Sequence, residues 1–304
     1  MQMDKEKRVI ALGFFDGVHL GHAALLARTN ARARELGAKP FVLSFDTHPG
    51  QFISGETVPL INSPEGRVDL IRRLFGIRDV LLLHFDGRMR QMAWQDFVTV
   101  LQKEFGAVHV VCGRDFRFGY QGEGTADLLL EACGARGMGC DVVEEVSIDG
   151  GAVSSSRIRT LLQDGEMKEA NRLLGHPHTL VDTVRHGYKL GRTLGAPTIN
   201  MLFPEGVLKL PYGVYATQVY IGDEAHYAVT NVGLRPTTGR PGQVTVESYI
   251  LDFAADLYGR EVRVEFFHYL RPELKFEDLD ALKTQIKTDV EATRNYFDSH
   301  LNAQ

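Results

Sequence analysis

The chain has 304 residues, of which 44% are hydrophobic and 24% charged, a composition typical of a globular protein long enough for two domains. Its net charge of -5 supplies no general field for nucleic acid, so a nucleic-acid-binding role is disfavoured. The three cysteines lack CxxC spacing, which argues against a disulfide framework or a thiolate zinc site and favours a reducing cytoplasm. No stretch of about 20 uninterrupted apolar residues occurs, so we expect a soluble, unexported protein with no membrane partner.

The first half alternates short apolar runs with longer amphipathic ones, which is the pattern of a parallel α/β domain. We predict strands at 9–12, 41–45, 80–85, 108–112 and 141–146, and helices after His22 and at 67–75 and 94–105. Such alternation builds a doubly wound parallel sheet with helices on both faces. A further helix is predicted over 155–174, where it connects two domains.

The second half has a different residue pattern, in which runs of β-branched and aromatic residues are separated by Gly and Pro. The runs lie at 214–221, 226–232, 244–251 and 262–269, which is typical of an antiparallel barrel, and 276–297 carries apolar residues at helical spacing. We therefore expect a first domain at 1–153, a connecting helical segment at 154–178, and a β-barrel domain with a C-terminal helix at 179–304. No internal repeat relates the halves, so two different sites are plausible.

A glycine-rich string, GFFDGVHLGH over 13–22, follows the first predicted strand and opens the first helix. In a doubly wound sheet the helix N-terminus meets the ligand crevice at this place, so an anion is expected there. The glycines let the backbone approach phosphate closely, and His19 and His22 can both donate hydrogen bonds to a triphosphate. The alternative is a tight turn in which Asp16 or His22 caps the helix.

This string resembles the extended FDGVHxGH form of the HxGH signature in bacterial bifunctional riboflavin kinase/FMN adenylyltransferases. That family also has a serine-rich element ending in arginine, which VSSSRIR over 153–159 matches. The alternative for this element is a serine N-cap followed by a solvated arginine. The resemblance implies catalytic roles for His19 and His22, and an ATP site made of Gly13, Phe15, Asp16, Gly17, His19, Gly21, His22, Ser154, Ser155, Ser156 and Arg159.

Two further segments resemble the flavin side of the same family, FDTHP over 45–49 and VCGRDFRFG over 111–119. Aromatic rings and an arginine suit an isoalloxazine ring and a phosphate. The resemblance implies flavin contacts from His48, Asp115, Phe116 and Arg117, although each segment alone is more often a strand end with a core aromatic. The chain departs from the family pattern at Thr47, Gly122 and Thr125.

The second half contains GYKLGRTLGAPTIN over 187–200, a basic, glycine-punctuated loop running into a strand. Thr198 and Asn200 lie two residues apart, so on an extended segment both oxygens face one side and can ligate one Mg²⁺. On spacing alone, ordinary turn and strand-edge residues are the better explanation of the pair. The string resembles the GRxLGFPTAN element of riboflavin kinases, and TNVGLRPT over 230–237, VES over 246–248 and LRPE over 270–273 follow in the family order. The resemblance implies Glu247 as general base, Thr198 and Asn200 at the metal, and an ATP and flavin site made of Gly187, Gly191, Arg192, Pro197, Thr198, Asn200, Asn231, Arg235 and Arg271.

Together the resemblances imply a cytoplasmic transferase that phosphorylates riboflavin to FMN with ATP in its second domain. The first domain is then expected to adenylylate FMN with a second ATP, giving FAD and pyrophosphate. Mg²⁺ is the expected cofactor, and the expected partners are riboflavin, FMN, FAD and ATP, without nucleic acid or membrane. Two alternatives stay open: a riboflavin kinase with a weakened adenylyltransferase half, and a non-catalytic flavin-binding regulator.

Overall fold

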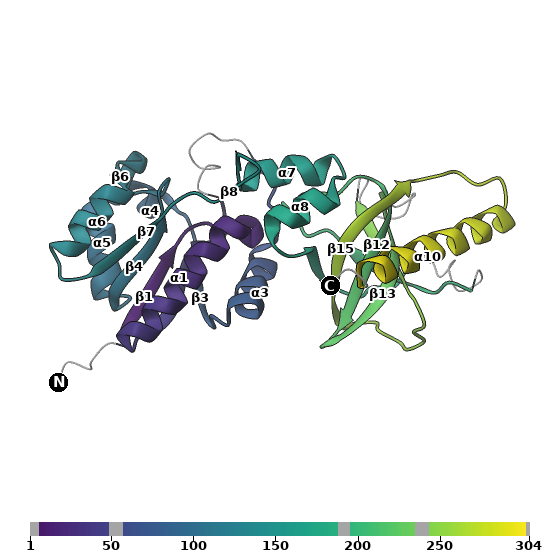
Figure 1. Ribbon diagram of the computed structural model, residues 1–304, viewed down its shortest axis with the longest axis horizontal. Helices are drawn as coiled ribbons and strands as arrows, with labels where there is room; N and C mark the ends of the chain where they lie inside the picture. The colour runs from purple at the N-terminus through teal and green to yellow at the C-terminus, as the bar shows by residue number, and fades with distance from the viewer. Residues whose placement is uncertain (1–5, 49–56, 188–194, 235–242, 302–304) are drawn as a thin grey trace. The chain divides into compact units, whose positions relative to one another are not determined.

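A computed structural model describes residues 6–48, 57–187, 195–234 and 243–301 of the chain (Figure 1). Contacts divide the chain into two compact units. The first unit comprises Met1–Val58 and Pro64–Ser155, and the second comprises Pro59–Ser63 and Ser156–Gln304. Each unit has its own sheet, and each is described separately below.

The first unit is built on a five-stranded parallel sheet with strand order β3-β2-β1-β4-β7. This confirms the predicted doubly wound sheet, because the chain order of the strands reverses across β1. The strands are β1 (Arg8–Leu12), β2 (Lys39–Phe45), β3 (Asp79–Leu83), β4 (Ala107–Gly113) and β7 (Gly139–Val143).

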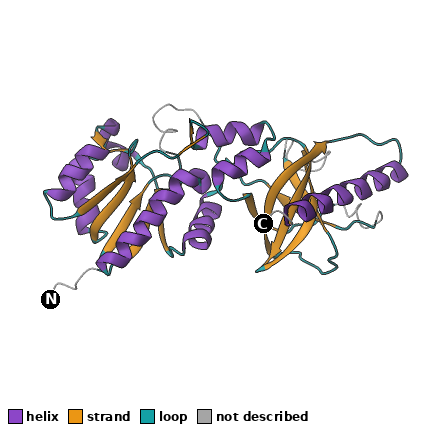
Figure 2. Cartoon of the chain, viewed as in Figure 1, coloured by secondary structure: helices purple, strands orange, loops and turns teal. Residues whose placement is uncertain are grey.

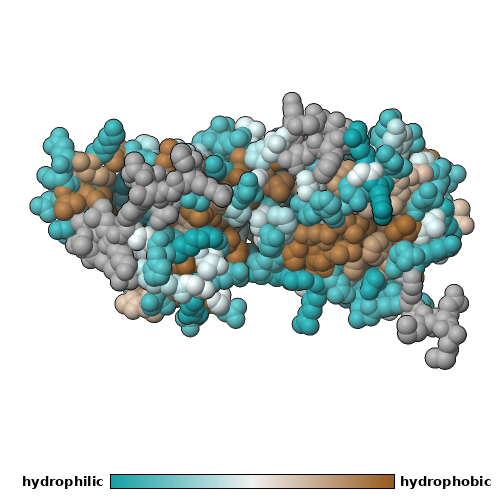
Figure 3. Space-filling model, turned by 180° about the vertical axis from the view of Figure 1, so that it is seen from behind, coloured by the Kyte–Doolittle hydropathy of each residue, from teal (hydrophilic) through white to brown (hydrophobic). Residues whose placement is uncertain are grey.

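Helices cover both faces of this sheet (Figure 2). Alternation along β1 explains why two cores form: Val9 and Ala11 pack with α1 (Leu20–Leu36) and α3 (Pro64–Phe75), whereas Ile10 and Leu12 pack with α5 (Trp94–Lys103) and α6 (Ala126–Gly134). From behind, a broad area of hydrophobic side chains is visible on the first unit (Figure 3). Short elements complete the unit: η1 (Asp16–Val18), α4 (Gly87–Gln91), β5 (Arg117–Phe118), η2 (Tyr120–Gly122), β6 (Gly124–Thr125), β8 (Ser147–Ile148) and β9 (Gly151–Ala152).

The predicted single helix over 155–174 is wrong, because the segment forms two helices, α7 (Ser155–Gln163) and α8 (Met167–Leu174). Gly165 adopts a φ of 78° between them, in the left-handed region that glycine enters without steric penalty. Of the four leucines expected to anchor this segment, Leu162, Leu173 and Leu174 are buried, whereas Leu161 is only partly buried.

The second unit is a curled, six-stranded antiparallel sheet with order β10-β15-β12-β13-β14-β11, followed by a helix. An isolated bridge joins Arg185, just after β10, to Asn200 on β11, so the two edges of the sheet approach each other as in the predicted barrel. Helix α10 covers the outer face, where Phe297 stacks on Tyr227 with ring centroids 4.3 Å apart. The elements are β10 (His178–Thr183), β11 (Thr198–Leu202), β12 (Gly213–Ile221), β13 (Glu224–Leu234), β14 (Val244–Ile250), β15 (Glu261–Pro272) and α10 (Leu279–Leu301).

Five residues from the middle of the first half belong to the second unit. Leu60 pairs with Val207 in a parallel bridge, with its N–H 2.8 Å from the carbonyl oxygen of Gly206. Asn62 donates from Nδ2 to the carbonyl oxygen of Thr179 at 3.1 Å. These long-range backbone contacts tie residues 59–63 to the barrel.

None of the helices in the described part of the chain combines the length and the apolar character needed to cross a membrane.

Candidate functional sites

The turn after β1 has a strained backbone at the place where an anion was expected. Phe15 and Val18 have φ angles of 59° and 45°, both in the left-handed region, and Gly17 between them has a φ of 81°. Side chains other than glycine enter this region at a cost of about 1–2 kcal/mol per residue. Both side chains are buried, so the core holds the turn in this shape. Such strain is found at sites where a fixed geometry serves function.

His19 and His22 meet at the start of α1. The Nδ1 atom of His19 accepts the backbone N–H of His22 at 3.4 Å, and the two rings stack with centroids 3.6 Å apart. A Cβ on Gly21 would lie 3.0 Å from the His19 ring, so glycine gives that ring its room. Both histidines therefore lie at the helix N-terminus, where partial positive charge favours an anion.

His22 has a ring nitrogen available for a ligand. Its Nδ1 atom is buried and makes no hydrogen bond within the part of the chain that the structure describes. Burial, with smaller effects of His19 and Arg67, lowers the pKa of His22 well below its usual value, so the ring is neutral at physiological pH. A phosphate oxygen would satisfy this orphaned nitrogen if it carries the proton.

The serine-rich element reaches the turn through Ser155, whose hydroxyl donates to the carbonyl oxygen of Asp16 at 2.9 Å. Val153 also lies near the turn, with its carbonyl oxygen 3.7 Å from the position of a Cβ on Gly21. Ser156 and Arg159 belong to the second unit, where an Arg159 nitrogen donates to the Ser156 hydroxyl at 3.3 Å. The structure thus joins the turn to the start of the serine-rich element.

The two predicted flavin segments begin in the last residues of β2 and β4, the strands on either side of β1. Because all three strands are parallel, these segments and the turn lie at the same edge of the sheet. The His48 ring packs edge-on against Phe14, with centroids 4.7 Å apart. After β4, the Phe116 ring stacks on Phe118 at 5.5 Å, Asp115 lies against the backbone of Gly113, and Arg117 is exposed.

Two departures from the family pattern have local structural roles. Thr125 is the N-cap of α6, where its hydroxyl oxygen accepts the N–H of Leu128 at 3.2 Å. Gly122 has a φ of 68°, which a residue with a side chain adopts only under strain. Both residues shape the loop after β4.

In the second unit, the predicted kinase residues lie in one row across the strands. Asn200 on β11 is the register partner of Glu247 on β14, and Glu247 is the partner of Asn231 on β13. Asn231 in turn pairs with Val214 on β12, whose partner on β15 is Arg271. Register partners share a face of the sheet, so an amide, a carboxylate and a second amide are side by side.

Thr198 lies on the same face as Asn200, because both belong to β11 and are two residues apart. The spacing therefore does place the hydroxyl and the amide together, with the Glu247 carboxylate beside the amide. Gly187 lies close to this amide. A Cβ at position 187 would lie 2.4 Å from Nδ2 and 2.5 Å from Oδ1 of Asn200, so only glycine fits there without a shift. Pro197 precedes β11 and is exposed, whereas Gly191, Arg192 and Arg235 lie outside the described residues.

Hydroxyl groups support the row from inside the barrel. Thr230 and Ser248, the chain neighbours of Asn231 and Glu247, are fully buried, and their hydroxyl oxygens are 2.7 Å apart. Thr217 extends the chain with a hydroxyl 2.7 Å from that of Thr230. These bonds hold β12, β13 and β14 in register behind the row.

Comparison with known proteins identifies both halves. Residues 1–157 match the FAD synthetase family and residues 174–297 the riboflavin kinase family. A relative from Pseudomonas fluorescens is 39% identical over 292 residues, covering 94% of this chain and 92% of its own length, and is named a bifunctional riboflavin kinase/FMN adenylyltransferase. A Listeria monocytogenes relative of the same name is 34% identical, with 95% and 92% covered.

The chain belongs to the bifunctional riboflavin kinase/FMN adenylyltransferase family. Among solved structures, a Streptococcus pneumoniae protein described as a macrolide-efflux protein is similar, with a TM-score of 0.83, 32% identity, and 95% and 94% of the two chains covered. The resemblance inferred from the motifs is thus confirmed over nearly the whole chain.

Sequence reasoning missed two buried charged residues, one in each unit. Arg67 on α3 is fully buried and donates to the carbonyl oxygens of Phe14 and Phe45. Asp289 on α10 forms two hydrogen bonds with the guanidinium of Arg271. Both looked like ordinary polar positions of amphipathic helices, and nothing in local spacing distinguishes a buried charge from a solvated one.

Proposed function

We propose that the second unit phosphorylates riboflavin to FMN with ATP, and that the first unit adenylylates FMN with a second ATP to give FAD and pyrophosphate. The observation that carries this proposal is the retention of both sites in one chain. The histidine turn lies at the carboxyl edge of the parallel sheet, and the row of Asn200, Glu247 and Asn231 lies on one face of the barrel. Family membership supplies the two activities.

In the kinase step, Glu247 takes the proton of the terminal ribityl hydroxyl as that oxygen attacks the γ-phosphorus of ATP. A bond from this oxygen to phosphorus forms, the bond to the β-phosphate oxygen breaks, and ADP leaves. A positioned base contributes roughly 10²–10⁴-fold, whereas alignment of the reactants can supply about 7–11 kcal/mol of the barrier. The rigid row therefore contributes chiefly by positioning its substrates.

Thr198 and Asn200 fit a magnesium ion, since a hydroxyl and an amide oxygen are hard donors of the kind that Mg²⁺ accepts. Their shared face and the closely packed Gly187 support a fixed oxygen site. When bound with ATP, Mg²⁺ neutralises phosphate charge during transfer. Thr198 and Asn200 would hold and orient it, and Glu247 accepts the proton of the attacking hydroxyl.

The adenylyl-transfer step needs no enzyme nucleophile. An oxygen of the FMN phosphate attacks the α-phosphorus of ATP, and the bond to the β-phosphate oxygen breaks, releasing pyrophosphate. The turn and the N-terminus of α1 supply fixed dipoles to the phosphates, and His19 and His22 stabilise the charge that develops. The molecules that the two sites bind are riboflavin, FMN, FAD and ATP. The three free cysteines fit a reducing cytoplasm.

The test is incubation with riboflavin, ATP and Mg²⁺, followed by chromatography for FMN, FAD, ADP and pyrophosphate. Glu247→Gln is expected to lower FMN formation by roughly 10²–10⁴-fold while FAD still forms from supplied FMN. His22→Ala is expected to abolish FAD formation while FMN accumulates. The matched control for Glu247→Gln is Glu224→Gln, whose side chain is 83% exposed.

Equal loss of both activities in either variant would contradict the assignment to two sites. FMN formation by the wild type without any FAD would instead favour a kinase with an inactive first unit. Flavin binding with no consumption of ATP would favour the non-catalytic regulator.

A further inference from the structure

Arg67 is a fully buried cation beside the histidine turn, and the activities proposed above assign it no role. One terminal nitrogen, Nη1, donates to the carbonyl oxygen of Phe14, and the other, Nη2, donates to the carbonyl oxygen of Phe45 at 2.7 Å. The Phe14 carbonyl follows β1, and the Phe45 carbonyl ends β2. One guanidinium thus spans the ends of two neighbouring strands.

The same side chain also holds the Phe14 ring. The central carbon of the guanidinium lies 4.2 Å from the centroid of that ring, a cation–π contact. The Phe14 ring also packs against His48, a predicted flavin contact, with ring centroids 4.7 Å apart. Ser44 adds a second donor, with its hydroxyl 2.9 Å from the Phe14 carbonyl oxygen. Phe14 is therefore fixed at its carbonyl and at its ring.

Burying the Arg67 guanidinium carries a desolvation cost. A charged residue kept at such a position is expected to have a role there. Burial lowers the pKa of Arg67 to about 10, against the opposing effects of Asp16, Asp46 and Glu65, so the group remains charged at neutral pH. Its Nε atom makes no hydrogen bond within the described part of the chain. A hydrophobic residue of similar length would fill the same space without this desolvation.

We propose that Arg67 is a positioning residue for adenylyl transfer, which fixes Phe14 and so sets both the left-handed turn that leads to His19 and the loop that carries His48. Phe14 is the residue directly before the strained Phe15, so a change at its carbonyl is transmitted to the turn. The inference rests on the proposed function of the first unit. The reaction class and substrates are unchanged, and Arg67 acts through Phe14.

The test compares Arg67→Met and Arg67→Lys in the full chain. Met keeps an unbranched side chain without charge or donors, and Lys keeps the charge but cannot span two carbonyls as a fork does. We measure kcat and KM for FAD formation from FMN and ATP, riboflavin phosphorylation by the same samples, and the unfolding midpoint. The matched control is Arg72→Met, since Arg72 is an exposed residue on the same helix.

Arg67→Met is expected to lower kcat for adenylyl transfer about 100-fold, the effect of a misplacement of roughly 1 Å, while kinase kcat/KM stays within about twofold. Arg67→Lys is expected to recover part of that loss. A purely structural arginine would lower the unfolding midpoint but leave kcat per folded molecule unchanged. An adenylyl-transfer kcat within about threefold of wild type in folded Arg67→Met would overturn the proposal.

If Arg67→Met does not fold, Arg67→Lys decides, because lysine keeps the charge but cannot donate to the carbonyl oxygens of Phe14 and Phe45 together as the guanidinium does. A selective fall in adenylyl transfer of about 3–10-fold supports the proposal, and unchanged adenylyl transfer overturns it. Wild-type protein that forms no FAD would overturn the proposed function together with this inference. Normal FAD formation by wild type and variants alike would overturn this inference alone.

Discussion

The carboxylate of Asp289 on α10 accepts two hydrogen bonds, of 2.8 and 2.7 Å, from the guanidinium of Arg271 on β15. Only 5% of the Asp289 side chain and 18% of the Arg271 side chain are exposed. Gln285 donates to the same carboxylate at 2.9 Å. Because Arg271 ends the row that contains Glu247, this pair joins the helix to the candidate kinase site.

We expect Asp289→Asn to destabilise the second unit by about 1–3 kcal/mol, since it leaves a partly buried guanidinium without its counter-charge. Riboflavin phosphorylation should fall, while FAD formation from FMN continues. Denaturant unfolding and the two activity assays check this outcome. Asp280→Asn is the control on the same helix, since that side chain is 92% exposed. Unchanged stability of Asp289→Asn would show that the pair does not anchor α10.

Gly187→Ala is expected to impair the kinase without affecting adenylyl transfer. The new Cβ would lie 2.4 Å from the Asn200 amide nitrogen, so either the amide or the chain at 187 must shift. A shift of about 1 Å at a positioning group lowers turnover by up to about 100-fold. Gly134→Ala serves as control, because nothing lies within 4 Å of a Cβ there. Wild-type riboflavin turnover by Gly187→Ala would argue against Asn200 in the site.

Gly17→Ala tests the histidine turn. Gly17 has a φ of 81°, so alanine there costs about 1–2 kcal/mol and favours a different turn. We expect a selective loss of FAD formation, measured beside riboflavin phosphorylation. Gly37→Ala is the matched control: its φ of 58° imposes a similar cost at the end of α1, with nothing within 4 Å of the new Cβ. Similar FAD formation by the two variants would mean that the turn geometry is not needed for the reaction.

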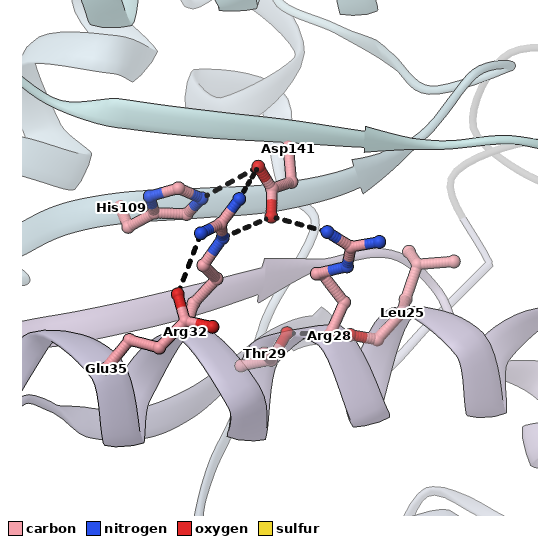
Figure 4. Close-up of polar contacts among 7 residues, drawn as sticks. All are labelled: Leu25, Arg28, Thr29, Arg32, Glu35, His109 and Asp141. Atoms are coloured by element: carbon pink, nitrogen blue, oxygen red, sulfur yellow. Dashed lines mark hydrogen bonds and ion pairs between the residues drawn. The ribbon is translucent and has the colours of Figure 1, made fainter.

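The first unit is expected to lose stability in acid through Asp141 and His109, which face each other at 3.4 Å (Figure 4). Burial alone would raise the pKa of Asp141, but the hydrogen bond from Arg32 and the nearby positive charges lower it. Burial also lowers the pKa of His109, although Asp141 opposes this. Both folded pKa values are thus below the unfolded ones, and the unfolded chain binds more protons.

Stability should therefore begin to fall as the pH drops below the unfolded histidine pKa of about 6.5, and fall further below the aspartate value of about 3.9. Urea unfolding between pH 7 and 3, followed by Trp94 fluorescence, measures this, since Trp94 is the one tryptophan and lies in the first unit. Asp141→Asn should destabilise the first unit at pH 7 by about 1–3 kcal/mol and remove the part of the acid dependence that lies below the aspartate value of about 3.9. Glu35→Gln, with a side chain that is 58% exposed, should change little. A parallel pH dependence in Asp141→Asn would exclude the carboxylate as its source.

Periodicity predicted the elements that depend on neighbours in the chain. The short apolar run from Val9 to Leu12 predicted a strand, and the structure buries both faces of that strand. The spacing of Thr198 and Asn200 predicted that both lie on one face of β11. Gly165 was overlooked as a helix break because the apolar residues on both sides keep helical spacing. Arg67 and Asp289 could not be found, since their burial depends on contacts with residues distant in sequence.

The backbone hydrogen bonds between Leu60 and the barrel limit where the chain can be cut to separate the two activities. A fragment that begins at residue 156 lacks the backbone partner of Leu208, whose N–H donates to the Leu60 carbonyl oxygen at 2.7 Å. It also lacks the Asn62 amide bound to Thr179. The second unit is thus completed by residues 59–63, which lie within the sequence of the first unit. A fragment cut at the sequence boundary between the units therefore lacks part of the kinase fold.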